Sequence, residues 1–225
     1  MPPVEPPPSR PLPEGFLPPN CTFSEQDWPV LARQWFPVSR VDEVPAKPRQ
    51  VILLNLRLAI YRMPDGIRIG RDMCPHRGLP LSTGRIEDDE LVCAYHGLRY
   101  GSDGQCRKAP EKLALKTVEC FRITMFPAVE RHGLVWTCLI PQGEPGIPDI
   151  HSTIEASDPE HPASPIKLQY EDWMGSTKFE FSEGEITIDP EHHRSLQDLA
   201  LNEYQRLFSE MGLITTAPAL QPSRA

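Results

Sequence analysis

The chain has 225 residues and a formal net charge of −8, with 23 Lys and Arg residues against 31 Asp and Glu residues. This acidic balance argues against a nucleic-acid-binding protein, which needs a basic face to displace phosphate counterions. No apolar run approaches the roughly 20 residues that cross a bilayer, and no secretory signal is visible, so we expect no membrane contact. Six cysteines without an export signal indicate a reducing compartment, and we expect a cytoplasmic protein with free thiols.

Proline dominates the beginning of the chain. It accounts for 27 of the 225 residues, and nine of these lie within the first 20. Because proline fixes φ and lacks a backbone donor, residues 1–24 are predicted to form a disordered, extended tail.

A different texture begins at residue 25 and continues to 141. Short runs of Val, Ile, Leu and aromatic residues alternate with turn signals such as Pro64-Asp65-Gly66, 101–104 and His132-Gly133. This pattern predicts a mainly β domain over 25–141, a small antiparallel sandwich or barrel. The expected strands are 49–55, 57–62, 67–71, 91–94, 118–124 and 134–140.

The residues after 141 are expected to form a linker and a smaller element. Six prolines lie between 141 and 165, so 142–165 is predicted to be a proline-rich linker. A β-hairpin and an amphipathic α-helix are predicted over 166–212, followed by a tail over 213–225.

Within this smaller element, the hairpin is expected to pair 166–171 with 178–188. Asp189 can cap the helix that follows, and Gly212 ends it. Its apolar stripe consists of Leu196, Leu199, Ala200, Tyr204, Leu207, Phe208 and Met211.

Two similar short motifs in the β region carry metal-ligating residues. The first motif is C-P-H-R-G at 74–78. The second, C-A-Y-H-G, begins at position 93, and sixteen residues separate it from the histidine of the first. Each motif offers one thiolate and one imidazole in a tight turn, and the glycine that ends it supplies backbone freedom. If the two turns met tip to tip, they would assemble a metal site from Cys74, His76, Cys93 and His96.

This donor set has three interpretations. In an iron–sulfur cluster, replacing two thiolates on one iron by neutral imidazoles lowers the negative charge and raises the potential. A structural Zn²⁺ also accepts two cysteines and two histidines, but zinc modules usually place both cysteines on one knuckle. A chance arrangement of core cysteines and surface histidines is the third. The mixed knuckles, their glycines and the β context favour one [2Fe–2S] cluster per chain.

The segment 73–106 resembles the Rieske [2Fe–2S] domain of Rieske non-haem iron oxygenases, the aromatic-ring-hydroxylating and demethylase-type enzymes. The likeness extends through 35–38 and 126–141. The leucine that follows the second His-Gly, Leu98, makes the motif similar to that of the demethylase and monooxygenase branch. The resemblance implies a flavin reductase or ferredoxin as electron donor, an oxygenase chain as acceptor, and assembly into a homo-oligomer.

The resemblance also implies roles for the four candidate ligands. Cys74 and Cys93 would hold a buried iron, and His76 and His96 would hold an outer iron, with one ring nitrogen of each facing solvent or a partner. Respiratory Rieske proteins carry an extra cysteine in each loop, and the two form a disulfide.

Leu79 and Tyr95 stand at the positions of those extra cysteines, which favours the oxygenase or ferredoxin type. Of the remaining cysteines, Cys120 and Cys138 are expected to be core residues of apolar strands. Basic residues beside the loops could receive an acidic electron donor or form a scattered solvated rim: Arg77, Arg85, Arg99, Arg107 and Lys108.

Oxygenases of this family have a second domain, in which two histidines and a carboxylate hold a mononuclear iron. None of the later histidines shows the expected H-x3–4-H spacing: His132, His151, His161, His192 and His193. Only 84 of the 225 residues follow position 141, too few for that domain and a linker.

We therefore predict no catalytic residue, and interpret the chain as an electron carrier in which 166–212 is a remnant of a catalytic domain. Two alternatives stay open: a complete monooxygenase or demethylase with an unrecognised iron site, and a non-redox zinc-binding interaction module.

Overall fold

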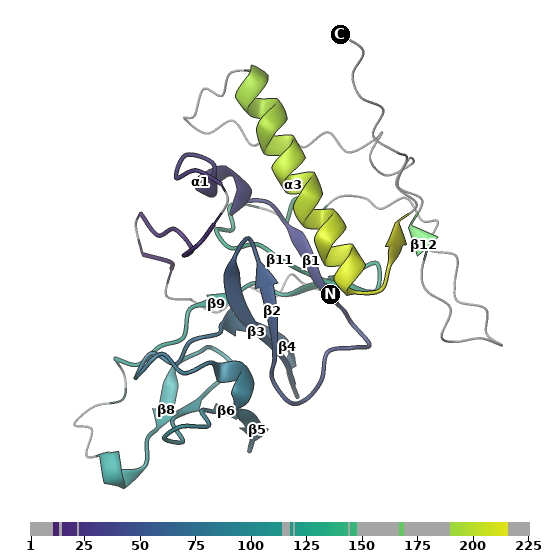
Figure 1. The fold of residues 1–225 in the computed structure, drawn as a ribbon. Coiled ribbons are helices and arrows are strands. Elements are labelled where there is room, and N and C mark those ends of the chain that lie inside the picture. Colours follow the sequence, from purple (N-terminus) through teal and green to yellow (C-terminus); the bar gives the residue numbers. More distant parts are fainter. Residues whose placement is uncertain are drawn as a thin grey trace, which may run out of the picture. The chain divides into compact units, whose positions relative to one another are not determined.

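The computed structural model describes residues 11–13, 15–21, 23–113, 118, 120–143, 145–147, 167–168 and 190–215. The chain divides into two compact units, Met1–Pro145 and Gly146–Ala225. The first unit contains three antiparallel sheets, and a long helix belongs to the second (Figure 1). The chain is thus mainly β with a helix near its C-terminus, as predicted.

The central sheet of the first unit has the order β2-β3-β4-β9. Leu54 and Asn55 join its first two strands with φ values of 46° and 63°, the backbone of a two-residue hairpin turn. The predicted turn at Pro64-Asp65-Gly66 joins the next pair. The strands are β2 (Arg49–Leu53), β3 (Leu56–Met63), β4 (Gly66–Arg71) and β9 (Met125–Phe126).

A second sheet has the order β5-β6-β7-β8, and it follows the chain without a crossover. Asp88 and Asp89, with φ values of 51° and 59°, form the turn between its first two strands. In Figure 1, β5, β6 and β8 form one group and β2, β3 and β4 another. The strands are β5 (Arg85–Glu87), β6 (Glu90–Val92), β7 (Arg99–Tyr100) and β8 (Cys106–Lys108).

The third sheet has the order β1-β11-β10. The predicted turn at His132-Gly133 joins its last two strands in sequence. Three short helical segments complete the unit: α1 (Trp28–Leu31) and the 3-10 turns η1 (Leu81–Thr83) and η2 (Glu111–Leu113). The strands are β1 (Phe36–Arg40), β10 (Val129–Arg131) and β11 (Leu134–Thr137).

One apolar core joins the first and second sheets. It is built from side chains that are nearly inaccessible to solvent and contribute the main driving force for packing. The two candidate cysteine ligands are part of it. Its members are Ala59, Tyr61, Met63, Cys74, Leu81, Leu91, Cys93, Leu98, Tyr100, Cys106, Ile123 and Met125.

The described residues of the segment predicted to be an N-terminal tail pack on the domain. The Phe16 ring meets the Trp28 ring edge-on at a centroid distance of 5.8 Å, and the Phe23 ring stacks on Trp28 at a centroid distance of 5.9 Å. The Arg71 guanidinium lies 4.9 Å from the Phe16 ring centroid, a cation–π distance. Apolar side chains spaced between the prolines supply this attachment.

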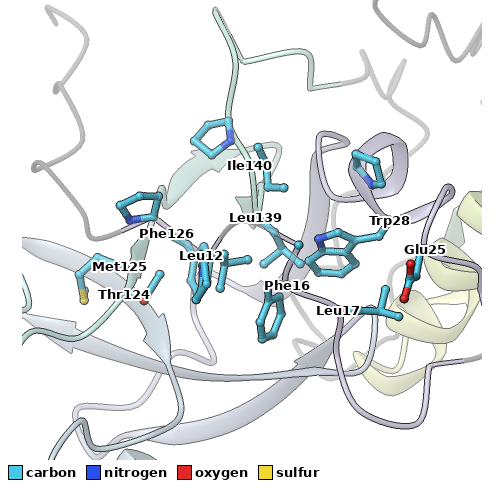
Figure 2. A pocket seen from close by; sticks show the side chains of 15 residues that line it. Leu12, Phe16, Leu17, Glu25, Trp28, Thr124, Met125, Phe126, Leu139 and Ile140 are labelled. Atoms are coloured by element: carbon cyan, nitrogen blue, oxygen red, sulfur yellow. The ribbon is translucent and has the colours of Figure 1, made fainter. Parts of the chain in front are cut away.

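An apolar pocket of about 540 Å³ lies between the N-terminal segment and the domain. Figure 2 shows Phe16, Trp28 and Leu139 around this space, and Phe126 also lines it. None of the four candidate metal ligands lines the pocket.

One expected strand, 118–124, is wrong for the residues described there. Phe121 and Arg122 are not part of a strand, although Arg122 forms an isolated bridge with Gln105. Pairing with β4 begins only at Met125. The apolar alternation that suggested a strand instead places Ile123 in the core, and its N–H bonds the Gly104 carbonyl at 2.9 Å.

The second unit contains α3 (Pro190–Glu210), the predicted amphipathic helix. Gly212, with φ of 68°, ends it: its N–H bonds the Ser209 carbonyl at 3.0 Å, and the Leu213 N–H bonds the Phe208 carbonyl at 2.9 Å. These two bonds form a Schellman motif. The buried members of the predicted stripe are Leu196, Ala200, Tyr204, Leu207 and Phe208.

Two short strands accompany α3. β12 (Lys167–Leu168) pairs in parallel with β13 (Ile214–Thr215), which lies within the segment 213–225 that was predicted to be a tail. The rest of the predicted hairpin, the Asp189 cap and most of the predicted linker lie outside the described residues. No helix in the described ranges is both long enough and apolar enough to span a bilayer.

Candidate metal centre

The two Cys-His motifs fold into loops with the same backbone hydrogen bonds. In the first, the Cys74 N–H bonds the Leu79 carbonyl at 2.8 Å, and the Gly78 N–H returns to the Cys74 carbonyl at 2.8 Å. In the second, the Cys93 N–H bonds the Leu98 carbonyl at 2.9 Å, and the Gly97 N–H returns to the Cys93 carbonyl at 3.0 Å.

The glycines are required by this geometry. Gly78 and Gly97 have φ values of 74° and 72°, which lie in the left-handed region that other residues adopt at a cost. The sequence prediction that these glycines supply backbone freedom to two matching turns is therefore confirmed.

The structure pairs the two sulfurs in the core. Cys74 and Cys93 are each only 2% exposed, and their side chains are within hydrogen-bonding distance of each other. The Tyr100 hydroxyl lies 3.2 Å from the Cys74 sulfur. Backbone N–H groups also point at each sulfur: those of the second and third residues after Cys74, and those of the second and third residues after Cys93.

The two imidazoles form a second pair, nearer the surface. Nδ1 of His76 and Nδ1 of His96 are 3.3 Å apart, and both side chains are half-buried. Each ring is also braced by an aromatic neighbour. Tyr95 lies over His96 with a centroid distance of 3.7 Å, and Phe121 meets His76 edge-on at 5.6 Å.

The electrostatics of the sulfur pair suit a cation. The hydrogen bond with Cys93, helped by the Tyr100 hydroxyl and backbone N–H groups, lowers the pKa of Cys74 to about 5 even though burial opposes this. The same bond with Cys74, together with burial, raises the pKa of Cys93. Each thiol opposes the ionisation of the other, because two adjacent buried thiolates repel each other. A bound metal cation removes this conflict, since metal ligation requires deprotonated thiols.

No cluster of three or more metal-ligating side chains converges on one point within the described ranges. The four candidate residues lie instead as two pairs, sulfur with sulfur and imidazole with imidazole. A [2Fe–2S] cluster with mixed ligation needs such pairs, because each iron takes two ligands of one kind. The residues present therefore fit this group.

Three of the five basic residues near the loops are held in ion pairs. Arg85 bonds Glu87 at 2.6 Å, and Arg107 bonds Asp103 at 2.8 Å. Arg99 is surrounded by the carboxylates of the β5–β6 hairpin, and its partner Asp88 is 3.0 Å away.

The other two members of this basic set are exposed. Arg77 and Lys108 make no ion pair with any residue that the structure describes. The predicted basic rim is therefore reduced to these two cations.

Of the cysteines expected in the core, one is there and one is not. Cys138 is fully buried, and burial raises its pKa to about 12. Cys120 is exposed, which contradicts the prediction, because it lies in the irregular segment rather than in a strand. Cys106 is also buried in the core, beside the candidate ligands.

Residues 34–121 match the family of the Rieske [2Fe-2S] domain, and this range contains both loops. This region is a Rieske domain. Rieske domains bind a [2Fe–2S] cluster, so the cofactor predicted from the two motifs is confirmed.

Relatives of the Rieske domain occur in larger oxygenase components. The oxygenase component of dicamba O-demethylase from Stenotrophomonas maltophilia is 36% identical over 116 residues, which cover 51% of this chain and 33% of that protein. The vanillate O-demethylase oxygenase subunit of Pseudomonas sp. (strain ATCC 19151) is 45% identical over 87 residues, which cover 38% of this chain and 25% of that protein. This chain thus spans about a third or less of their length.

A solved structure gives a similar result. The Pseudomonas putida CBB5 NdmA QL mutant with caffeine aligns with a TM-score of 0.50 and 29% identity, covering 60% of this chain and 41% of that one. The likeness again covers only part of the larger chain.

Proposed function

We propose that Cys74 and Cys93 hold one iron of the cluster, that His76 and His96 hold the other, and that the chain carries single electrons to a non-haem iron oxygenase centre. The donor would be a flavin reductase or a ferredoxin, and the oxygenase centre would lie on another chain. The observation that carries the proposal is the pairing of like ligands, with Cys74 and Cys93 in the core and the Nδ1 atoms of His76 and His96 3.3 Å apart.

The burial of the two pairs supports this assignment. Two thiolates give their iron a larger negative charge, and the core encloses Cys74 and Cys93 almost completely. Two neutral imidazoles give the other iron a smaller negative charge, so an added electron is accommodated more easily there. When bound, the cluster supplies reversible one-electron chemistry.

The half-buried histidines suit the exchange of electrons with a partner. His76 and His96 are more accessible than the cysteines, and Tyr95 beside them is 57% exposed. Arg77 follows His76 in the first loop, and Lys108 pairs with Arg99 at the end of the second loop, so both add exposed positive charge beside the loops in a chain of net charge −8. An acidic electron donor would be steered towards such a patch at low ionic strength.

The proposed acceptor follows from the relatives. Several are oxygenase components or subunits, and the matched region is only a part of each. Because the matched part here includes the Rieske domain, electron delivery is the function that this region can perform by itself.

Metal analysis after anaerobic reconstitution tests the cluster assignment. We expect about two irons and about two acid-labile sulfides per chain, which correspond to one cluster. The reduced protein should give an electron paramagnetic resonance (EPR) signal typical of mixed cysteine and histidine ligation. Cys74→Ala and His96→Ala should abolish the visible absorption. Cys138→Ala, another buried cysteine, should keep the absorption and lose only some stability. Tightly bound zinc without labile sulfide would refute the assignment.

A second experiment tests electron transfer. Stopped-flow mixing with a reduced ferredoxin should bleach the oxidised cluster, and the rate should fall as salt is added because screening weakens steering. A double Arg77→Gln, Lys108→Gln variant should lose most of this salt dependence. If neither a ferredoxin nor a flavin reductase reduces the cluster, the electron-carrier function is contradicted.

A further inference from the structure

The two cluster loops differ in how their ends are held together. The second loop, 93–98, is closed by its flanking strands, because Val92 pairs with Arg99 in the β6–β7 ladder. The first loop, 73–81, has no such ladder. It leaves β4 in one sheet and enters, through the 3-10 turn η1 (Leu81–Thr83), β5 of another sheet.

A buried carboxylate joins the ends of the first loop. Asp72 is 4% exposed and directly precedes the loop. Its Oδ1 accepts the Ser82 N–H at 2.7 Å, and its Oδ2 accepts the Ser82 hydroxyl at 2.7 Å. The carboxylate therefore binds the residue that follows the loop through both oxygens.

The same carboxylate is fixed to the central sheet. Gln50 on β2 donates from Nε2 to Asp72 Oδ2 at 2.6 Å, and the Asp72 N–H bonds the Arg57 carbonyl of β3 at 2.9 Å. One side chain thus connects β2 with both ends of the loop. A buried carboxylate with three donors is a well-satisfied group, and removing it leaves those donors unpaired.

We propose that Asp72 is a positioning residue for the cluster: its grip on Ser82 replaces the missing strand ladder and fixes where the first loop presents Cys74 and His76. This inference rests on the ligand roles proposed above. A polar lock suits this place because the loop crosses from one sheet to the other, where no backbone pairing can hold it.

Three variants remove different numbers of the hydrogen bonds that the Asp72 side chain accepts. Asp72→Ala removes all three side-chain bonds. Asp72→Asn is the conservative variant, because its amide oxygen can still accept the Ser82 N–H. We expect Asp72→Ala to change hydrogen exchange in the first loop and the EPR g-values strongly, and Asp72→Asn to change them only slightly. Ser82→Ala keeps the N–H bond and should fall between them, which provides a test if Asp72→Ala does not fold.

Hydrogen exchange, followed by mass spectrometry on the cluster-loaded chain, gives an internal comparison. The Cys74 and Gly78 amides make the same two bonds in the first loop as the Cys93 and Gly97 amides make in the second. In Asp72→Ala, exchange should accelerate about tenfold in the first loop, as expected for losing hydrogen bonds to a charged group, and little in the second. The EPR g-values should also shift, because two of the four ligands lie on the loosened loop.

Thr137→Val is the matched control. It removes another buried hydrogen bond, from the Thr137 hydroxyl to the Pro127 carbonyl at 2.7 Å, in the β1-β11-β10 sheet. It should lower the melting temperature while leaving the EPR signal and both loops unchanged.

The proposal is overturned if the Asp72 and Ser82 variants lower the melting temperature as Thr137→Val does but leave the g-values and the first loop unchanged. If the wild-type chain carries no labile sulfide, the ligand assignment fails instead, and the same exchange comparison, made on the chain without a cluster, shows whether Asp72 closes the loop.

Discussion

Replacing Tyr100 by Phe should lower the reduction potential of the cluster. The Tyr100 hydroxyl lies 3.2 Å from the Cys74 sulfur, and the side chain is fully buried. A hydroxyl hydrogen-bonded to a ligating sulfur stabilises negative charge on that sulfur, and the reduced cluster carries one more electron than the oxidised form. The variant therefore loses more stabilisation in the reduced form than in the oxidised form.

The size of the effect follows from the type of bond. A hydrogen bond to a charged group contributes about 1.5–3 kcal/mol, and we assign about half of the upper value to the difference between the two redox states. For one electron, about 59 mV corresponds to 1.4 kcal/mol, so we expect a decrease of about 60 mV. The substitution removes one oxygen atom and leaves the apolar packing of the ring in place.

The assay is a spectroelectrochemical titration of wild type and variant, with Tyr61→Phe as the matched control. Tyr61 is equally buried in the same core, but its hydroxyl has no hydrogen-bond partner in the part of the chain that is described. Tyr61→Phe should leave the potential unchanged and should not reduce stability, because it removes an unsatisfied polar group. Equal potentials for Tyr100→Phe and Tyr61→Phe would refute the role of the Tyr100 hydroxyl.

Two further predictions concern thiol reactivity and packing. Iodoacetamide at about pH 8 should label exposed Cys120 much faster than Cys138, because burial blocks access to Cys138 and raises its pKa to about 12. Mass spectrometry of the native protein measures the two labelling rates, and equal rates would contradict the burial of Cys138. Gly84→Ala should destabilise the domain by about 3 kcal/mol, because its Cβ would lie 2.3 Å from the Val92 carbonyl oxygen. Gly133→Ala, where no atom lies within 4 Å of the new Cβ but φ is 70°, should cost only about 1 kcal/mol, and thermal melts should show this order.

The local features of the site could be predicted from the sequence because each depends on a few neighbouring residues. In both motifs a glycine stands four residues after the cysteine, Gly78 after Cys74 and Gly97 after Cys93, and this spacing specifies a tight turn. Hairpin turns that contain a glycine could be predicted in the same way. The turn at Leu54 and Asn55 was not, because nothing in those two residue types requires positive φ.

The residues that support the ligands could not be found in this way. Asp72 and Gln50 are 22 positions apart, and Tyr100 is 26 positions from Cys74, so both contacts depend on how the sheets pack. Cys120 was placed in the core because its neighbours are apolar, although the chain there is irregular and exposes it. The aromatic residues of the proline-rich segment were overlooked as anchors because composition alone suggested a tail.

The route of the first loop from one sheet to another has a consequence for assembly of the domain. If each iron takes one ligand from each loop, as proposed, the cofactor is a covalent bridge between two sheets whose strands do not pair with each other. Loading iron and sulfide should then raise the melting temperature of both sheets together, because ligands that bind only the folded chain stabilise every part they connect.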